Sequence, residues 1–308
     1  MRQAIEDFLL AKKAQASSPN TIKGYRAALA QLVGFVGENQ GLAVLTRTVL
    51  RAYLASLIRQ KYSNASIDVK VGVLRSFLHW LHAEERISEN FYLEAMSVKG
   101  PRRTIRLPDI PSVEEIALLL DGDFPTAFPQ RDRLILELLY GAGLRVSEAA
   151  HLTLDDLRPE QNAILIHGKG GHYGKAAKLR VVPINPYVQK ALTPYLALRA
   201  KALERRRLKP SALFFGLAGK HTESPISTRS VHRMLLHMTK VRGLQPMHPH
   251  LLRHACATHM LDNGAPLDVI QHLLGHDNIE ITAHYAQVST RLMMSAYNRA
   301  HPHAMGRK

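Results

Sequence analysis

The stretch HPHLLRHACATHMLDN, from His248 to Asn263, shows what kind of chain surrounds it. Its apolar residues recur at helical spacing, which predicts a helix over 249–263. His250 precedes Arg253 by three residues, so the two side chains share one face of that helix. A fixed cation beside a titratable imidazole indicates that this helix face can bind an anionic group and transfer protons.

The chain around this helix is mainly helical and contains one predicted β-hairpin. The two β-rich runs are 163–167 and 179–184, and the glycine- and lysine-rich segment between them predicts a turn. Ser112 and Glu115 have the spacing of a capping box, which predicts a helix that starts there. Helices are predicted at 112–120, 132–141, 186–206, 227–241, 267–274 and from 279 onward.

The first hundred residues predict a small bundle of about four helices. The segment that follows, VKGPRRTIRLPDIP at 98–111, contains three prolines, one glycine and three arginines and is typical of an extended linker. We therefore divide the chain into a helical domain at 1–98, a basic interdomain linker at 99–111 and a mostly helical second domain at 112–308.

The composition indicates a globular protein with an anionic partner. Of the 308 residues, 41 Lys and Arg against 25 Asp and Glu leave a formal charge of +16, and 46% are apolar, which excludes a disordered or low-complexity chain. Nucleic acid is the first partner to expect at this charge, and an anionic membrane surface is the second. We expect neither a signal peptide nor a membrane span. Cys256 is the only cysteine, which suits a reducing cytoplasm.

Three familiar kinds of site fit the sequence poorly. GKGGHYGK, around Lys169, lacks the glycine and the serine or threonine that a nucleotide phosphate loop needs, and GAGLRV lacks the last glycine of a dinucleotide fingerprint. His250 and His254 share a helix face, but the fixed charge of Arg253 beside them disfavours a metal ion. The sequence therefore predicts no ATP, NAD or metal cofactor.

A different group of residues suits chemistry at a phosphate. Arg145 and Arg253 can each bind two phosphate oxygens through a planar guanidinium. His250 and His276 can move protons near neutral pH. Tyr285, nine residues after His276, carries a hydroxyl that can attack phosphorus and form a covalent phosphotyrosyl bond without a metal.

Five motifs of the chain, in their order and spacing, resemble the tyrosine recombinase (phage integrase) family. They are GLRVSE at Arg145, GKG at Lys169, HLLRHACATHML from His250, LLGHDNIEIT at His276, and Tyr285 itself. The resemblance implies a mainly α fold, in which a SAM-like core-binding bundle precedes a mostly helical catalytic domain with a small antiparallel β-sheet. It also implies that the two domains close around DNA as a C-shaped clamp.

The resemblance further implies a role for each site residue. Arg145 and Arg253 clamp the scissile phosphate, and His276 hydrogen-bonds to it. Tyr285 attacks and stays on the 3′ phosphate, while His250 assists proton transfer. The bond energy is conserved for rejoining, so neither ATP, a divalent ion nor another cofactor is required.

The acid that protonates the departing 5′ hydroxyl is expected to be a lysine of the hairpin. Lys169 fits best, because its GKG directly follows the first strand, as in the family pattern. The turn here is longer than in that pattern, so Lys175 or Lys178 remains an alternative. Glu148, three residues after Arg145, resembles the acidic residue behind the family's site and is interpreted as a structural partner that orients a cation.

The resemblance implies double-stranded DNA with specific recombination sites as the partner, and a homotetramer on two duplexes that passes through a Holliday junction, with or without a related recombinase or accessory protein. No membrane partner is expected, and the location is expected to be the cytoplasm, in association with the nucleoid. Besides Lys175 and Lys178, the residues expected to follow the phosphate backbone lie in the linker and are Arg102, Arg103 and Arg106.

Two alternatives stay open. The apolar strip near the C-terminus either packs in the core of its own chain or docks on a neighbouring protomer; its residues are Leu292, Met293, Met294 and Tyr297. The biological role is either dimer resolution or the integration, excision or inversion of a mobile element, and because no further DNA-binding domain is expected ahead of the bundle, the simple Xer-like type is favoured. The competing classes are a DNA-binding protein with an inactive site and a metal-dependent phosphoesterase.

Overall fold

The computed structural model describes residues 1–101, 109–168, 179–206, 211–216, 224–275 and 296–302. The described residues form two compact units, one within residues 1–107 and one from residue 108 onward. Both are mainly helical, and the second contains a three-stranded antiparallel sheet, so the predicted fold class is confirmed.

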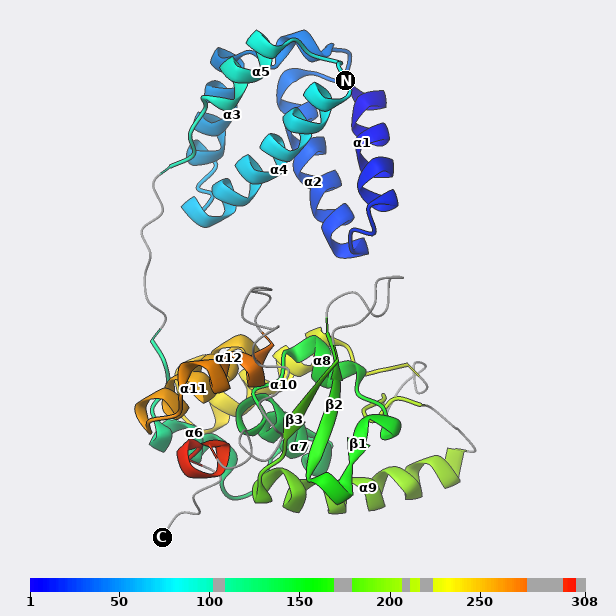
Figure 1. The fold of residues 1–308 in the computed structure, drawn as a ribbon, viewed down its shortest axis with the longest axis vertical. Coiled ribbons are helices and arrows are strands. Elements are labelled where there is room, and N and C mark those ends of the chain that lie inside the picture. Colours follow the sequence, from blue (N-terminus) through cyan, green and yellow to red (C-terminus); the bar gives the residue numbers. More distant parts are fainter. Residues whose placement is uncertain (102–108, 169–178, 207–210, 217–223, 276–295, 303–308) are drawn as a thin grey trace. The chain divides into compact units, whose positions relative to one another are not determined.

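The first unit is an all-helical bundle in which α4 contacts each of the other α-helices (Figure 1). Its elements are α1 (Arg2–Ala14), α2 (Pro19–Val36), the 3-10 helix η1 (Leu42–Val44), α3 (Arg47–Arg59), α4 (Asn64–Ala83) and α5 (Glu89–Met96). Four of the α-helices have a serine or threonine at the N-cap position. The side-chain hydroxyl of each accepts the backbone N–H three residues later; the residues are Ser18, Thr46, Ser63 and Ser88. Aromatic rings of Phe8 and Phe77 form the centre of its core.

Helix α3 begins at Arg47, because the Thr46 side chain caps it, and Leu45 is buried ahead of the cap. The bundle differs from the prediction of about four helices by a fifth α-helix, α5, whose start is capped by Ser88 after the turn at the end of α4.

The second unit interleaves helices with a small sheet. Its α-helices are α6 (Val113–Leu120), α7 (Pro129–Gly141), α8 (Val146–His151), α9 (Pro186–Arg206), α10 (Thr228–Val241), α11 (Pro249–Asp262) and α12 (Leu267–Leu274). Its strands are β1 (Leu157–Arg158), β2 (Ala163–His167) and β3 (Leu179–Pro183), and its 3-10 helices are η2 (Leu154–Asp156) and η3 (Pro159–Gln161). The predicted capping box at Ser112 is confirmed, since Ser112 and Glu115 exchange both hydrogen bonds.

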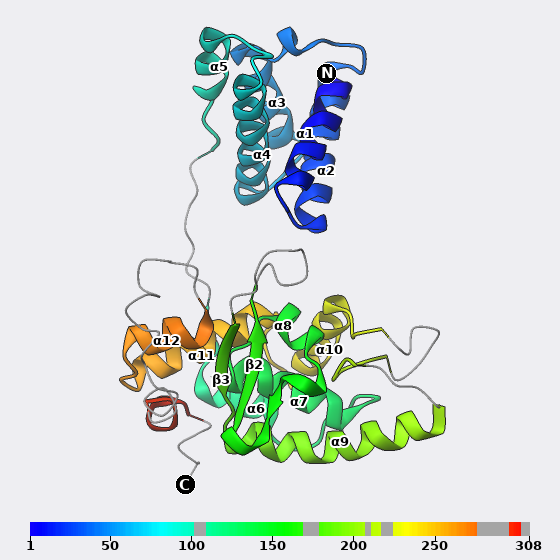
Figure 2. The same cartoon turned by 45° about the vertical axis from the view of Figure 1, so that its right-hand side comes forward.

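Helix α7 forms the centre of this unit. Its residues from Leu134 to Gly141 are all buried, and it contacts α6, α8, α9, α10 and α11. In both ribbon views the strands lie near the middle of the unit, with α11 and α12 to one side of them and α9 below (Figures 1 and 2). Strand β3 contacts α12, and α11 contacts both α7 and α12, so the sheet lies next to the helices that follow His248.

The predicted hairpin is confirmed, with a short extra strand. The sheet order is β1-β2-β3, and Ile164 pairs with Val182 while Ile166 pairs with Arg180. Strand β1 has only two residues, which is too short for an alternating pattern to be seen in the sequence. The hairpin brings the start of β3 opposite the end of β2, at the edge from which the loop 169–178 leaves.

The described C-terminal segment packs within its own unit. Residues 296–300 are helical, and Tyr297 is fully buried in the core of the second unit. The Tyr297 hydroxyl donates to the carbonyl of Gly141, and His301 Nε2 lies 3.2 Å from the carbonyl of Tyr140. For Tyr297 the structure therefore shows packing in the same chain; Leu292, Met293 and Met294 lie outside the described residues.

Candidate active site

Arg145 occupies the junction between α7 and α8. The chain leaves α7 through Gly143, whose φ of +61° lies in the left-handed region, and Arg145 then takes the N-cap position of α8. Its backbone N–H donates to Glu148 Oε2 at 2.8 Å and its Nη1 to Glu148 Oε1 at 2.9 Å. The Arg145 side chain remains 31% exposed, so the guanidinium is anchored but still accessible.

Arg253 reaches the same place from α11. Its side chain is only 8% exposed, and its Nη1 donates to the carbonyl of Gly143 at 2.6 Å. Its Nη2 donates to the carbonyl of Leu274, at the end of α12. Arg253 Nη1 also lies 3.9 Å from Glu148 Oε2, which completes an ion pair. The two arginines that the sequence singles out therefore lie together, although more than a hundred residues separate them.

A third arginine, Arg180, belongs to this group and was missed in the sequence analysis. It lies on β3, its side chain is 9% exposed, and its Nη1 and Nη2 donate to the two oxygens of Glu148 at 2.9 and 2.8 Å. Arg180 and Val182 share one face of the strand, and Val182 is fully buried. A charged residue at an inward-facing position of an alternating strand is the signal that could have identified it.

We call Arg145, Arg180, Arg253 and Glu148 the arginine cluster. Each arginine in it donates to a different carbonyl at the end of α12: Arg180 to Leu273 at 3.0 Å, Arg253 to Leu274, and Arg145 to Gly275 at 2.9 Å. Carbonyls in the last turn of a helix lack partners within the helix and attract cations. The three guanidinium groups therefore supply both the hydrogen bonds and the charge that this helix end requires.

Electrostatic interactions within the cluster keep the Glu148 carboxylate and the Arg253 guanidinium charged at neutral pH. Burial would raise the pKa of the Glu148 carboxyl, but hydrogen bonds and the charge of Arg180, together with hydrogen bonds from Arg145, lower it below its ordinary value. Burial, followed by the positive charge of Arg145, lowers the pKa of Arg253 to about 10, while Glu148 opposes the change. Arg253 is therefore still protonated at neutral pH.

His250 lies at the exposed start of α11, beside the cluster. Burial lowers its pKa, and the charges of His248, Arg253 and His254 lower it further, so the imidazole is neutral at pH 7. His248 caps the same helix, because its Nδ1 accepts the backbone N–H of Leu251 at 3.1 Å. A neutral imidazole one helical turn from Arg253 has the right form to accept or relay a proton.

The remaining predicted site residues lie outside the described residues. These are Lys169, Lys175, Lys178, His276, Tyr285 and the linker residues Arg102, Arg103 and Arg106. Among the described residues, no three His, Cys, Asp or Glu side chains are grouped closely enough to hold a metal ion. No helix in the described ranges is long and apolar enough to cross a membrane.

Both ends of the hairpin loop are nevertheless anchored. At the end of β2, His167 Nε2 lies 3.0 Å from Asp156 Oδ1, and Asp156 Oδ2 accepts from the backbone N–H and the hydroxyl of Thr153, each at 2.8 Å. At the start of β3, Arg180 is held by Glu148. The described residues on either side of 169–178 are therefore each held by a side-chain contact, and on β3 that contact is part of the arginine cluster.

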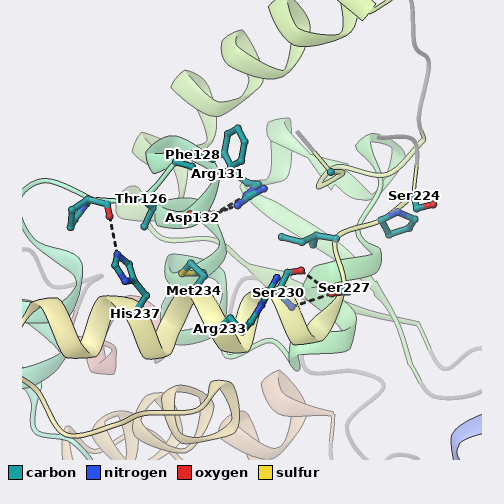
Figure 3. Close-up of a pocket in the computed structure, with 15 residues that line it drawn as sticks. Thr126, Phe128, Arg131, Asp132, Ser224, Ser227, Ser230, Arg233, Met234 and His237 are labelled. Atoms are coloured by element: carbon teal, nitrogen blue, oxygen red, sulfur yellow. Dashed lines mark hydrogen bonds and ion pairs between the residues drawn. The ribbon is translucent and has the colours of Figure 1, made fainter. Parts of the chain in front are cut away.

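A cavity of about 850 Å³ lies elsewhere in this unit, between α10 and the loop before α7 (Figure 3). Arg131 and Asp132, which line it, form an ion pair at 2.7 Å, and His237 binds the carbonyl of Pro125 at 3.1 Å. No residue of the arginine cluster lines this cavity. The cavity has its own cations and imidazole in Arg131, Arg233 and His237, but it is separate from the arginine cluster and from His250.

Comparison with known proteins identifies the family of the chain. Residues 112–291 match the model of the phage integrase family, and residues 5–85 match that of the phage integrase N-terminal SAM-like domain. A tyrosine recombinase XerC of Syntrophus aciditrophicus (strain SB) is 36% identical over 300 residues, which cover 94% of each chain. A tyrosine recombinase XerC of Bacillus pumilus (strain SAFR-032) is 35% identical over 296 residues, which cover 93% of this chain and 92% of that one.

Solved structures share the fold at lower identity. A lambda integrase dimer bound to a COC′ core site matches with a TM-score of 0.68 and 17% identity, over 94% of this chain and 96% of that one. A XerH site-specific recombinase bound to a palindromic difH substrate matches with a TM-score of 0.68 and 21% identity, over 92% and 81%. The chain therefore belongs to the phage integrase family and is a Xer-like tyrosine recombinase, an enzyme of site-specific DNA strand cleavage and rejoining.

Proposed function

We propose that the arginine cluster binds the scissile phosphate of a DNA recombination site and that Tyr285 cleaves the strand there. The observation that carries the proposal is the convergence of Arg145 and Arg253 on one carboxylate and one helix end. Three guanidinium groups and one carboxylate leave a formal charge of 3 − 1 = +2 in a largely buried setting. This charge suits a phosphodiester, and it suits even better the greater negative charge of a pentacoordinate phosphorus.

The chemical steps divide between the described cluster and the residues outside it. The Tyr285 oxygen forms a bond to phosphorus, the bond to the 5′ oxygen breaks, and Lys169 delivers a proton to that oxygen. The proton that the Tyr285 hydroxyl loses is taken up by His250, which is a neutral imidazole at the start, and His276 donates a hydrogen bond to the phosphate. Attack by the 5′ hydroxyl of a second strand reverses the steps and releases the tyrosine.

Arg145 is the arginine best suited to touch the phosphate directly. It is the most exposed of the three, at 31% against 9% for Arg180 and 8% for Arg253. Arg253 is tied to Gly143 and Leu274, so it contributes mainly a fixed positive charge and the position of the loop before Arg145. A phosphate held by such preorganised donors needs little rearrangement when charge develops.

The proposed assembly is a homotetramer on two DNA duplexes that passes through a Holliday junction. A lambda integrase tetramer bound to a Holliday junction shares the fold, with a TM-score of 0.66. We assign residues 1–98 to core DNA binding, 99–111 to a basic linker whose arginines Arg102, Arg103 and Arg106 follow the backbone, and 112–308 to catalysis. Both domains are proposed to contact the duplex, in the cytoplasm and at the nucleoid. The tetramer forms with or without a related recombinase or accessory protein.

The C-terminal segment is proposed to act as a protomer-exchange tail. Tyr297 and His301 pack against the end of α7, which leads directly into the loop that positions Arg145. If a neighbouring protomer supplied these residues instead, its binding would affect the position of the end of α7 and, through it, the position of Arg145. Tail exchange is therefore a route by which active sites can alternate.

Trapping of a covalent adduct tests the proposed function. DNA sites are selected by binding from a random-sequence pool, converted to nicked suicide duplexes, and incubated with the protein in EDTA before denaturing electrophoresis. We expect an adduct with the wild type that is absent from Tyr285→Phe and present in Tyr62→Phe, a control in the first unit. Cleavage that requires a divalent ion, or an adduct that survives in Tyr285→Phe, would overturn the mechanism.

A further inference from the structure

We infer that Arg180 is a positioning residue for strand cleavage, which holds Glu148 so that Arg145 keeps one accessible edge for the phosphate. The inference rests on the proposed function of the arginine cluster. None of the five sequence motifs includes Arg180, and its role follows from contacts alone.

The contacts of Arg180 leave it poorly placed to bind substrate. Each of its three nitrogen atoms donates to the protein: Nε to the carbonyl of Leu273 and the two Nη atoms to the carboxylate of Glu148. Its side chain is 9% exposed. A guanidinium used in this way is part of the support of the site.

Glu148 is shared between Arg180 and Arg145. Oε1 accepts from the Nη1 of each arginine at 2.9 Å, and Oε2 accepts from Arg180 Nη2 and from the Arg145 backbone N–H, both at 2.8 Å. Arg145 therefore obtains only one side-chain hydrogen bond from this carboxylate. If Arg180 were absent, Glu148 would lose two donors, and the guanidinium of Arg145 would be drawn in to replace them.

Arg180 also fixes the corner of the chain that precedes His276. Gly275 has a φ of +63°, and a Cβ placed on it would lie 3.1 Å from both Cδ and Nη1 of Arg180. The corner is therefore packed directly against the arginine side chain. Arg180 lies on β3, the strand that follows the segment containing Lys169, and it donates to Leu273, three residues before His276. The same side chain therefore links two parts of the chain that lie next to predicted site residues.

If Arg180 positions the site, its substitution should change the pH dependence of cleavage, which a purely structural role would leave unchanged. Without Arg180 the buried Glu148 would no longer have its main source of stabilising charge, so its protonation would move toward neutral pH. Cleavage by Arg180→Gln should therefore decline on the acid side at a higher pH than cleavage by the wild type. Lysine keeps the charge but lacks the planar fork, so Arg180→Lys should be intermediate.

The experiment measures single-turnover cleavage of the selected suicide duplexes across pH, with binding measured on the same duplexes. We expect Arg180→Gln to cleave about 10- to 100-fold more slowly at neutral pH, which is the effect of a misplacement of about 1 Å. Its dissociation constant should stay within about threefold of the wild-type value, because Arg180 does not touch DNA. Partial recovery in Arg180→Lys and a raised acid limb would support the role. Arg158→Gln, on β1 of the same sheet, is the matched control and should cleave like the wild type.

Two outcomes would overturn the inference. Wild-type rates and an unshifted pH profile in Arg180→Gln would show that the contact has no catalytic consequence. A slower Arg180→Gln whose pH profile is unchanged, and whose loss of rate matches a loss of binding and thermal stability, would show a purely structural role. If the wild type itself gave no Tyr285-dependent adduct, the proposed function would fail first, and the two failures are thereby distinguished.

Discussion

The guanidinium of Arg253 donates to the carbonyl of Gly143 over 2.6 Å, two residues before Arg145. This hydrogen bond connects α11 to the loop that carries Arg145, the other arginine of the proposed phosphate site. Gly143 is suited to the position, because its φ is +61° and because a Cβ on it would lie 2.9 Å from Leu274 Cδ2 and 3.2 Å from Cys256 Sγ. Backbone conformation and close packing therefore both require glycine where the two arginines meet.

Gly143→Ala should reduce stability and cleavage together. We expect a loss of about 1–2 kcal/mol from the left-handed backbone and about 1–3 kcal/mol from overpacking. The matched control is Gly243→Ala, which has a φ of +67° but no atom within 4 Å of the added Cβ, so it should show only the backbone loss. Urea unfolding of both variants measures the difference. Equal losses would show that packing around Gly143 is unimportant.

Glu148→Gln should destabilise the protein at neutral pH and much less in acid. The pKa of Glu148 is lowered in the folded state, so its charge contributes stability that is fully present above the ordinary glutamate pKa and is lost as the pH falls through the folded value. Removal of one partner from a buried ion pair typically reduces stability by about 3–5 kcal/mol. Urea unfolding of wild type and variant at several pH values should show curves that converge below about pH 4. A constant difference at all pH values would contradict the assignment.

Asp7→Asn provides a contrast in the first unit. The pKa of Asp7 is also lowered, chiefly by its hydrogen bond to Arg86, but this carboxylate is in contact with solvent. Its substitution should change stability far less than Glu148→Gln, because a screened surface pair contributes little.

His250 should titrate below the ordinary histidine pKa. Burial is the first cause and the neighbouring charges of His248 and Arg253 are the next, so the imidazole resists protonation. An NMR titration of the ring protons, assigned with His250→Asn, should give a midpoint below about 6.5. His254→Asn should move that midpoint upward, since it removes one of the charges that lower it. A midpoint at or above the ordinary value would exclude a neutral His250 at the start of the reaction.

Tyr297→Ala should strongly destabilise the second unit. The ring is fully buried, and its hydroxyl donates to the carbonyl of Gly141. Loss of a buried aromatic ring typically reduces stability by about 3–5 kcal/mol, whereas Tyr297→Phe, which loses only the hydrogen bond, should lose about 1–2 kcal/mol. Thermal unfolding of the full chain at two protein concentrations measures both. A stability that rises with concentration in the wild type would show that the segment also packs between protomers.

Local patterns were sufficient for most of the elements, and sequence motifs were sufficient for four of the described site residues, Arg145, Glu148, His250 and Arg253. The capping box at Ser112 and the two strands of the hairpin could be predicted because each depends on residues within a few positions of one another. Arg145 and Arg253 stood out as members of motifs, and the structure brings them together. The fifth helix of the bundle and the two-residue strand β1 were missed, because short elements have too few residues for a clear period.

By itself, the sequence determined the helical class, the hairpin, the basic charge and the set of residues suited to phosphate chemistry, because these follow from residue type and short-range periodicity. Only the tertiary structure decided that Arg180 faces Glu148, that three arginines share the end of α12, and that Tyr297 fills the core of its own unit. Those relationships join residues on different elements, far apart in the chain. No local pattern specifies which buried carboxylate or helix end a given arginine will reach, since packing of the whole unit sets that distance.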